Sequence, residues 1–251
     1  MAGKAGIVVG GTGGIGRALC RALVADGADL VVGYHSREET ARSLEAEGRG
    51  LGREVRAVRC DVLRREDIEA IVRTAGEAFG RIDFFVTTVG VDKVEWFLRQ
   101  GDADIDLAID LEFRSVVYCY REVLNVMAGQ GHGRLLTIAS DSGKVGSSGM
   151  AVSSGARGAV IAFTKAIARE MARYGITANV LCPGPTDTEL NRHQQDLSEA
   201  GAKVIGALNR MVPLGRMARP EEVALPALLL LSDEGAFITG QAVSVSGGLV
   251  M

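Results

Sequence analysis

Short runs rich in β-branched residues alternate with longer helix-like segments along this 251-residue chain, and that alternation restricts the fold more than any other feature. The strand-like runs are almost continuously apolar, which is typical of parallel strands covered on both faces. The segments between them repeat apolar residues at helical spacing, as Leu19, Leu23 and Val24 do. Seven strands are expected, at residues 5–10, 28–34, 54–60, 82–88, 133–140, 175–182 and 240–248.

The sequence therefore predicts an α/β protein with a Rossmann-type, doubly wound, seven-stranded parallel sheet and helices on both faces. No repeat or linker interrupts the pattern, so we expect residues 1–251 to form a single dinucleotide-binding domain. A long central helix is expected within 102–127, and a second helix should run to Tyr174. The segment near 185–215 is polar and less regular to about residue 210, and we expect it to form a lid over the substrate.

Composition excludes several classes of function. The net charge of −3 and the lack of a basic cluster argue against nucleic-acid binding. No apolar run reaches the roughly 18 residues of a membrane span, and the chain enters its first strand without a signal peptide, so a cytoplasmic location is expected. Four cysteines are scattered singly, without disulfide or metal-ligand spacing, which predicts reduced thiols and no metal site: Cys20, Cys60, Cys119 and Cys182.

A glycine-rich loop, "GGTGGIG", follows the first expected strand and opens the first helix, with Gly10, Gly14 and Gly16 in GxxxGxG spacing. Glycine allows a tight turn and a close backbone approach to a pyrophosphate, and the helix N-terminus offers free N–H groups to the anion. A glycine turn at this place can be purely structural. Its position in the first βα turn of an alternating chain favours a dinucleotide site.

The end of the second strand indicates which nucleotide is bound. An acidic residue there would bind the 2′-hydroxyl of NAD, whereas cationic or small polar groups accommodate a 2′-phosphate. This chain reads "VVGYHSRE", with no Asp or Glu before Glu38, and His35, Ser36 and Arg37 could surround a phosphate. In the alternative interpretation, Ser36 only caps the next helix and Arg37 is solvated. The pattern favours NADP(H) over NAD(H).

Several motifs together resemble the short-chain dehydrogenase/reductase family over essentially the whole chain. They are "GGTGGIG", "CDV" at 60–62, "NVLCPGPTDT" at 179–188 and "ITGQAVSVSGGL" at 238–249. Within the family, the chain looks most similar to 2-hydroxycyclohexanecarboxyl-CoA dehydrogenases and 3-oxoacyl-carrier-protein reductases. The motifs and the resemblance give the expected cofactor-binding residues: Gly10, Thr12, Gly13, Gly14, Ile15, Gly16, Tyr34, His35, Ser36, Arg37, Asp61, Val62, Gly90, Arg157, Pro183, Gly184, Thr186 and Thr188.

The resemblance also implies four catalytic positions, and this chain departs from the family at three of them. The serine that orients the substrate carbonyl is retained as Ser140 in "TIASDSG". The family's tyrosine, which exchanges the substrate proton, is replaced by Ser153, and its lysine by Arg157. The asparagine place falls in "AIDLEF", where we assign it to Asp110. Ser140, Ser153, Arg157 and Asp110 are therefore the candidate catalytic residues.

The substitutions change what these positions can do. A tyrosine hydroxyl titrates near 10 and a nearby cation can lower that value, whereas an aliphatic hydroxyl such as Ser153 is far less acidic. Arg157 keeps a positive charge but cannot release a proton. Asp141, which follows Ser140, and Asp110 could act as acids if desolvation raised their pKa values. Lys144 could reach the pocket, although an exposed loop lysine is the commoner case.

Three functions remain open at this point. The first is an oxidoreductase acting on a ketone or hydroxyacyl thioester with NADP(H) and an unusual proton donor. The second is a nucleotide-binding scaffold that has lost its chemistry and acts as a partner subunit or sensor. The third is a cyclase or isomerase that reuses the pocket. In each case the expected partners are a small molecule and, by resemblance, further copies of the chain in a homodimer or homotetramer, with no nucleic acid and no membrane.

Overall fold

One sheet of seven parallel strands organises the protein in this computed structural model, which describes residues 1–91 and 93–251. The strand order is β3-β2-β1-β4-β5-β6-β7. The chain thus winds outward from the centre in both directions, which confirms the Rossmann-type sheet expected from the alternation. The strands are β1 (Ala5–Val9), β2 (Asp29–Tyr34), β3 (Val55–Arg59), β4 (Phe84–Thr87), β5 (Gly133–Ile138), β6 (Ile176–Pro183) and β7 (Ala242–Val245).

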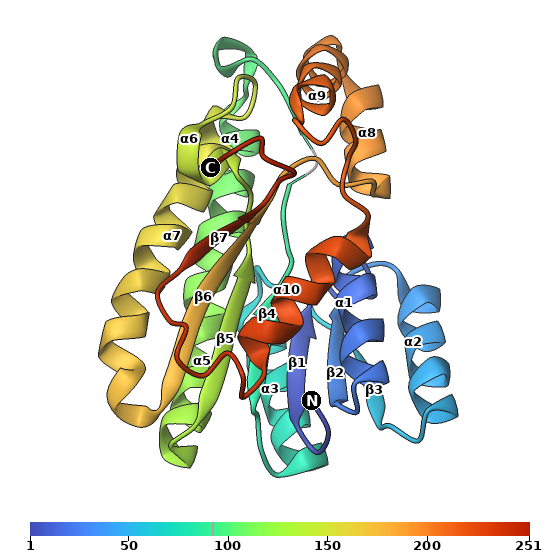
Figure 1. The fold of residues 1–251 in the computed structure, drawn as a ribbon, viewed down its shortest axis with the longest axis vertical. Helices are drawn as coiled ribbons and strands as arrows, with labels where there is room; N and C mark the ends of the chain where they lie inside the picture. The colour runs from blue at the N-terminus through green and yellow to red at the C-terminus, as the bar shows by residue number, and fades with distance from the viewer. Residues whose placement is uncertain (92) are drawn as a thin grey trace.

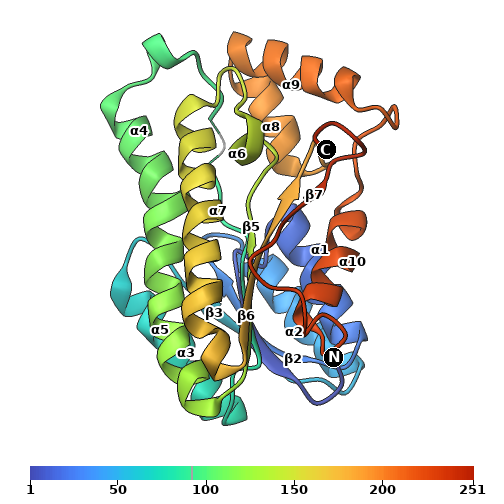
Figure 2. The same cartoon turned by 60° about the vertical axis from the view of Figure 1, so that its left-hand side comes forward.

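Helices cover both faces of this sheet, as Figures 1 and 2 show. On one side α1 packs against α2 and α10, and on the other α3 packs against α5, with α7 beside β6. The helices of these two layers are α1 (Gly14–Ala25), α2 (Glu38–Gly50), α10 (Pro220–Leu231), α3 (Arg65–Phe79), α5 (Ser115–Gln130) and α7 (Ala151–Met171). Among the described residues, no helix is long and apolar enough to cross a membrane.

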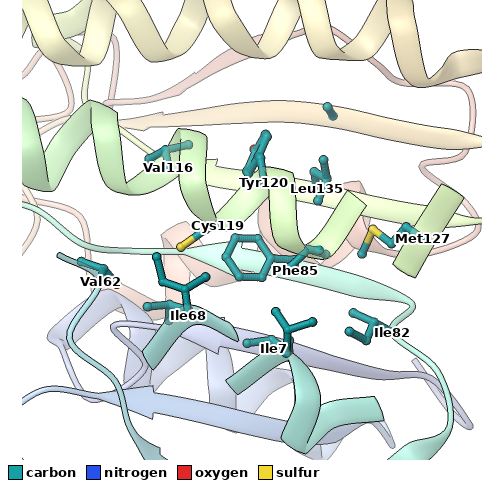
Figure 3. Close-up of a cluster of buried hydrophobic side chains, with 14 of the residues drawn as sticks. Ile7, Val62, Ile68, Ile82, Phe85, Val116, Cys119, Tyr120, Met127 and Leu135 are labelled. Carbon is teal, nitrogen blue, oxygen red and sulfur yellow. The ribbon is translucent and has the colours of Figure 1, made fainter. Parts of the chain in front are cut away.

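The core is split by the sheet into two apolar layers. In Figure 3, Phe85 of β4 and Tyr120 of α5 lie at the centre of one layer, with Ile7 and Ile68 beside them. The rings of Phe85 and Tyr120 meet edge to face at 6.1 Å, a favourable aromatic geometry. Both side chains are almost fully buried, so this layer fixes the distance between the central strands and α5.

The segment that follows β6 differs from the sequence prediction. Instead of an irregular stretch to about residue 210, it forms two helices, α8 (Glu189–Leu197) and α9 (Glu199–Met211). The hydroxyl of Thr188 accepts a hydrogen bond from Asn191 N, and Ser198 Oγ accepts one from Gly201 N. These N-caps satisfy amides at each helix start and so favour the formation of both helices. Figure 1 shows both beyond the carboxyl ends of the strands.

The central helix is also interrupted where a continuous one was expected. It consists of α4 (Asp102–Ile109), a π-helical turn at Asp110–Arg114, and α5. A π-turn inserts one extra residue into the helix and changes which side chains face inward. The alternative that Ser36 caps the second helix is wrong, because α2 begins at Glu38 with Arg37 at its N-cap position.

Candidate active site

A crevice lies where the strand order reverses, between the carboxyl ends of β1 and β4. In doubly wound sheets this is the place where ligands bind. Two cavities open along it, and Ile15, Thr188 and Leu190 line both of them. The two spaces are therefore adjoining parts of one cleft.

The glycine loop is shaped by contacts that exclude side chains. Gly10 has a φ of +76°, which glycine adopts without strain. A Cβ on Gly16 would collide with the carbonyl oxygen of Gly10, so only glycine fits this close turn. Helix α1 starts at Gly14 with no side-chain cap among the described residues, which leaves its first N–H groups free for an anion.

Two threonines bind this loop from neighbouring elements. The hydroxyl of Thr88, after β4, lies 3.2 Å from the carbonyl oxygen of Val9 and 2.9 Å from that of Gly10, and donates to them. From the other side, the methyl of Thr188 lies only 2.6 Å from the place where a Cβ on Gly14 would stand. Thr188 also caps α8, so the loop is held between β4 and the start of α8.

The larger cavity, about 640 Å³, extends from the glycine loop to the ends of β2 and β3. Most of the nucleotide residues expected from the sequence line it. They are Gly10, Thr12, Gly13, Gly14, Ile15, Gly16, His35, Ser36, Arg37, Asp61, Val62, Gly90 and Thr188. Thr88 and Leu63 line it as well and were not expected. Tyr34 is buried within β2 and lies outside the lining.

Arg37 forms an ion pair across the mouth of this larger cavity. Its Nη1 lies 2.8 Å from Oε2 of Glu189, the first residue of α8. Both side chains are about half exposed, so water screens the pair and it adds little to stability. The pair nevertheless keeps a guanidinium at the end of β2, where the sequence has His35, Ser36 and Arg37 and no Asp or Glu before Glu38.

The smaller cavity, about 300 Å³, lies under α8 and α9 beside the end of β5. Ser140, Arg157, Pro183, Gly184 and Thr186, all expected from the sequence, line it. Ser140 Oγ accepts a hydrogen bond from Ser142 N, which leaves its hydroxyl hydrogen free to point elsewhere. The rest of the lining is largely apolar and includes Met150, Leu190, Ile205, Leu208, Met211, Leu249 and Val250.

Arg157 is held by three protein groups at the junction of the two cavities. Its Nε donates to Ser153 Oγ at 3.2 Å, Nη1 donates to the carbonyl oxygen of Ala139, and Nη2 pairs closely with the carboxylate of Glu112. The side chain of Glu112 is 1% exposed and that of Arg157 12% exposed, so this is a buried ion pair. Glu112 Oε1 also accepts from Val91 N at 3.1 Å.

Glu112 was missed in the sequence, where Asp110 was assigned to the asparagine place. In the structure Asp110 is partly exposed and pairs with Arg114 at 2.7 Å, and it lines neither cavity. The π-turn accounts for this arrangement, because its extra residue turns Glu112 inward toward Arg157. Ser153 is buried behind Arg157 and does not line the cavities either. Of the four candidate catalytic residues, the cleft thus brings together Ser140 and Arg157.

Asp141 is the second residue that the site adds to the main candidates. It is 3% exposed and lines the smaller cavity beside Ser140. Burial raises the pKa of its carboxyl above the ordinary range, while the hydroxyls of Ser244 and Ser246 and the charge of Lys144 oppose that shift. Lys144 itself is exposed, and its ammonium donates to Ser244 Oγ at 2.8 Å.

Two tyrosines of α5 and the four cysteines have structural surroundings. Tyr120 is fully buried, its hydroxyl bonds Thr137, and burial raises its pKa to about 12. Tyr118 packs under the guanidinium of Arg65 on the surface of α5. All four cysteines are free and buried. Within residues 1–91 and 93–251, no group of His, Cys, Asp or Glu is arranged to hold a metal ion.

Comparison with known proteins gives the same picture over the whole chain. Residues 9–250 match the family model described as Enoyl-(Acyl carrier protein) reductase. The 3-oxoacyl-[acyl-carrier-protein] reductase of Synechocystis is 34% identical over 248 residues, covering 98% of this chain and 96% of the relative. The enzyme of that name from Escherichia coli is 33% identical, covering 99% and 98%.

Solved structures agree with this similarity. Levodione reductase superposes with a TM-score of 0.92 at 28% identity, covering 99% of this chain and 98% of the other. A variant of actinorhodin polyketide ketoreductase, crystallised with NADPH, superposes with a TM-score of 0.89 at 32% identity, covering 98% and 97%.

Proposed function

Because the chain belongs to the short-chain dehydrogenase/reductase family, we propose that it is an oxidoreductase that interconverts a keto group and an alcohol, with NADP(H) preferred over NAD(H). The observation that carries this proposal is the shared lining of the two cavities, which joins the glycine loop to Ser140. Such a cleft can hold a nucleotide at one end and a carbonyl compound at the other.

The residues of the larger cavity fit a dinucleotide. The free N–H groups at the start of α1 suit its pyrophosphate, and the turn at Gly10 and Gly16 leaves room for close approach. Arg37, His35 and Ser36 suit a 2′-phosphate, which supports NADP(H). A nicotinamide nucleotide, when bound, supplies or accepts the hydride of the reaction. The relative crystallised with NADPH is in line with this preference.

The protein's own groups would orient the substrate. Ser140, positioned by Ser142 N, can donate its hydroxyl hydrogen to the substrate oxygen. Arg157 cannot act as a proton donor, because a guanidinium is never deprotonated in proteins. Its charge remains fixed near the reacting end by Glu112, Ala139 and Ser153. The apolar lining under α8 and α9 suits an apolar ketone or acyl thioester, and the curated relatives named for 3-oxoacyl substrates point the same way.

A second candidate is a nucleotide-binding protein without turnover. The observation in its favour is the engagement of Arg157, since each of its three nitrogens already donates to a protein group. A lysine in this place would hold the nucleotide ribose in the family's usual arrangement, so fewer donors are available to the nucleotide here.

Binding and turnover together decide between the two candidates. NADPH and NADH are titrated by calorimetry, and oxidation of NADPH is then followed with acetoacetyl-CoA and a panel of cyclic ketones. We expect tighter binding of NADPH and measurable turnover. Ser140→Ala should lower kcat by about 10²–10³, as for other lost donors to a developing oxyanion, with an unchanged Kd for NADPH. NADPH binding without any turnover would establish the second candidate, and no binding of either nucleotide would overturn both.

A further inference from the structure

We propose that Asp141 supplies the proton that the substrate oxygen takes up, in a site where the family's tyrosine is replaced. This inference rests on the proposed reductase function and names the acid for it. Asp141 lines the smaller cavity of the cleft, next to Ser140 just after β5.

The backbone fixes Asp141 at the edge of the smaller cavity. Its own N–H donates to the carbonyl oxygen of Pro183 at 3.0 Å, while Ala139 N donates to Leu181 at 2.8 Å. These two bonds continue the β5–β6 ladder beyond the last strand residue. Asp141 is therefore held as firmly as the strands themselves, and it lies beside the hydroxyl that would orient the substrate.

The lining of this cavity contains few groups that can carry a proton. Among its described residues, Asp141 and Arg157 are the two with ionisable side chains. Arg157 keeps its proton at every accessible pH. The other acids and phenols near the site are engaged elsewhere: Glu112 pairs with Arg157, and Tyr120 bonds Thr137 in the core. By elimination within the lining, Asp141 is the group able to donate.

Asp141 is also kept in a state suited to donation. Both of its carboxylate oxygens are buried and form no hydrogen bond of ordinary geometry with the described residues, although the hydroxyls of Ser244 and Ser246 lie close enough to act on them. A carboxylate in such surroundings lacks the solvation that stabilises its charge, so the protonated form is favoured. This is the same direction as the raised pKa.

The groups that face Asp141 do not cancel this effect. Lys144 on α6 (Ser142–Val145) is the ammonium that acts on Asp141, but it donates to Ser244 and is exposed. Cys182 of β6 is a buried thiol whose pKa is raised to about 11, so it stays neutral. The hydroxyls of Ser244 and Ser246 are neutral as well, and the charge of Arg157 is paired with Glu112.

The proton step balances without a further reactant. As the carbonyl carbon receives the hydride that the proposed reaction supplies, the O–H bond of the Asp141 carboxyl breaks and a new O–H bond forms at the substrate oxygen. The products are an alcohol and the Asp141 carboxylate, which takes up a proton from solvent before the next turnover. In the oxidation direction the carboxylate accepts the proton of the alcohol.

The first test measures the protonation of Asp141 without any turnover. Infrared difference spectra of the free protein, wild type against Asp141→Asn, are recorded across a pH series. We expect a protonated carboxyl band at neutral pH that is missing in the variant. Asp233→Asn, at an exposed ion pair with Lys4, is the matched control and should keep the band. An Asp141 that is ionised at neutral pH overturns the inference.

The second test measures its contribution to the reaction. With NADPH and acetoacetyl-CoA, Asp141→Asn should lower kcat by about 10²–10⁴, the usual effect of losing a general acid, while the Kd for NADPH stays unchanged. The rate of substrate reduction by the wild type should fall as pH rises through the raised pKa of Asp141. The rate of the variant should not show this decrease. If the wild type turns over and Asp141→Asn matches it, the inference fails while the proposed function stands. If the wild type shows no turnover with any probe, the proposed function fails first, and the proton donor with it.

Discussion

The two ends of the cleft are built from different parts of the chain. At the glycine loop, the features that matter are made by the backbone: a positive φ at Gly10, a close turn at Gly16 and free N–H groups on α1. At the junction near α7, the features are made by side chains, chiefly the buried Glu112–Arg157 pair. The first end is therefore formed by backbone, and the second by side chains that bind one another.

The difference shows how the two kinds of site tolerate change. A backbone site depends on what is absent, namely side chains at a few glycines, so it persists as long as those glycines do. A side-chain site depends on a set of groups that must match one another. The carboxylate of Glu112 and the guanidinium of Arg157 satisfy each other, so either one is costly without its partner.

The largest expected effect is the loss of one member of that pair. Glu112→Leu leaves the Arg157 guanidinium buried without its partner, which should lower the free energy of unfolding by about 3 kcal/mol in urea titrations. Asp110→Ala, two residues earlier, removes an exposed ion pair with Arg114 and should change the free energy of unfolding by less than about 0.5 kcal/mol. The double variant Glu112→Leu/Arg157→Met should recover most of the loss. Equal effects at positions 110 and 112 would show that the π-turn does not separate their roles.

The next effect concerns the glycine loop. Gly16→Ala places a Cβ against the carbonyl oxygen of Gly10, and the resulting strain of about 1–3 kcal/mol should weaken NADPH binding by roughly 10–100-fold in calorimetry. Glu112→Leu, by contrast, should reduce stability much more than nucleotide affinity. If Gly16→Ala binds NADPH as tightly as the wild type, the loop is not the nucleotide site.

A smaller effect is expected at the end of β2. Arg37→Ala should weaken NADPH binding about tenfold through the loss of charge-assisted hydrogen bonds, with little change for NADH. Glu189→Gln should shift the preference the other way by a few-fold, because Arg37 no longer has a competing carboxylate. Both constants come from the same titrations. Parallel changes for the two nucleotides would place Arg37 outside the 2′-phosphate pocket.

The smallest effect is expected at Gly76, which serves as a control for the Gly16 variant. Gly76 lies inside α3, and a Cβ there would meet no atom within 4 Å. Gly76→Ala should therefore raise the free energy of unfolding by about 0.5–1 kcal/mol and leave NADPH affinity unchanged. A loss of stability here would indicate that alanine is unfavourable even at an open helical glycine. The effect of Gly16→Ala could then not be assigned to its contact with Gly10.

The contrast between backbone features and side-chain features also explains which regions could be predicted from the sequence. Alternating apolar runs predict the sheet, and glycine spacing predicts the loop, because both depend on local backbone preferences. Glu112 could not be found in this way, since a regular helical count across 102–127 gives no sign of the π-turn that turns it inward. Tyr34 was expected at the nucleotide, but it is buried in β2 and does not line the larger cavity.

The same limit applies to the helices after β6. The sequence of α8 is polar, and the caps at Thr188 and Ser198 act through single hydrogen bonds that short-range patterns do not resolve. Asp141 was weighed as an acid from its position after Ser140, but its burial and its unpaired oxygens depend on β6 and β7, which lie far away in the sequence.

Thr188 joins two functions in one small side chain. Its hydroxyl oxygen caps α8, and its methyl rests on Gly14 at the start of α1. These two halves can be separated chemically, since serine keeps the hydroxyl and valine keeps the methyl group. The order of α8 and the shape of the phosphate loop are thus mechanically linked through a single residue. A ligand that displaces the loop would therefore also shift the first turn of α8.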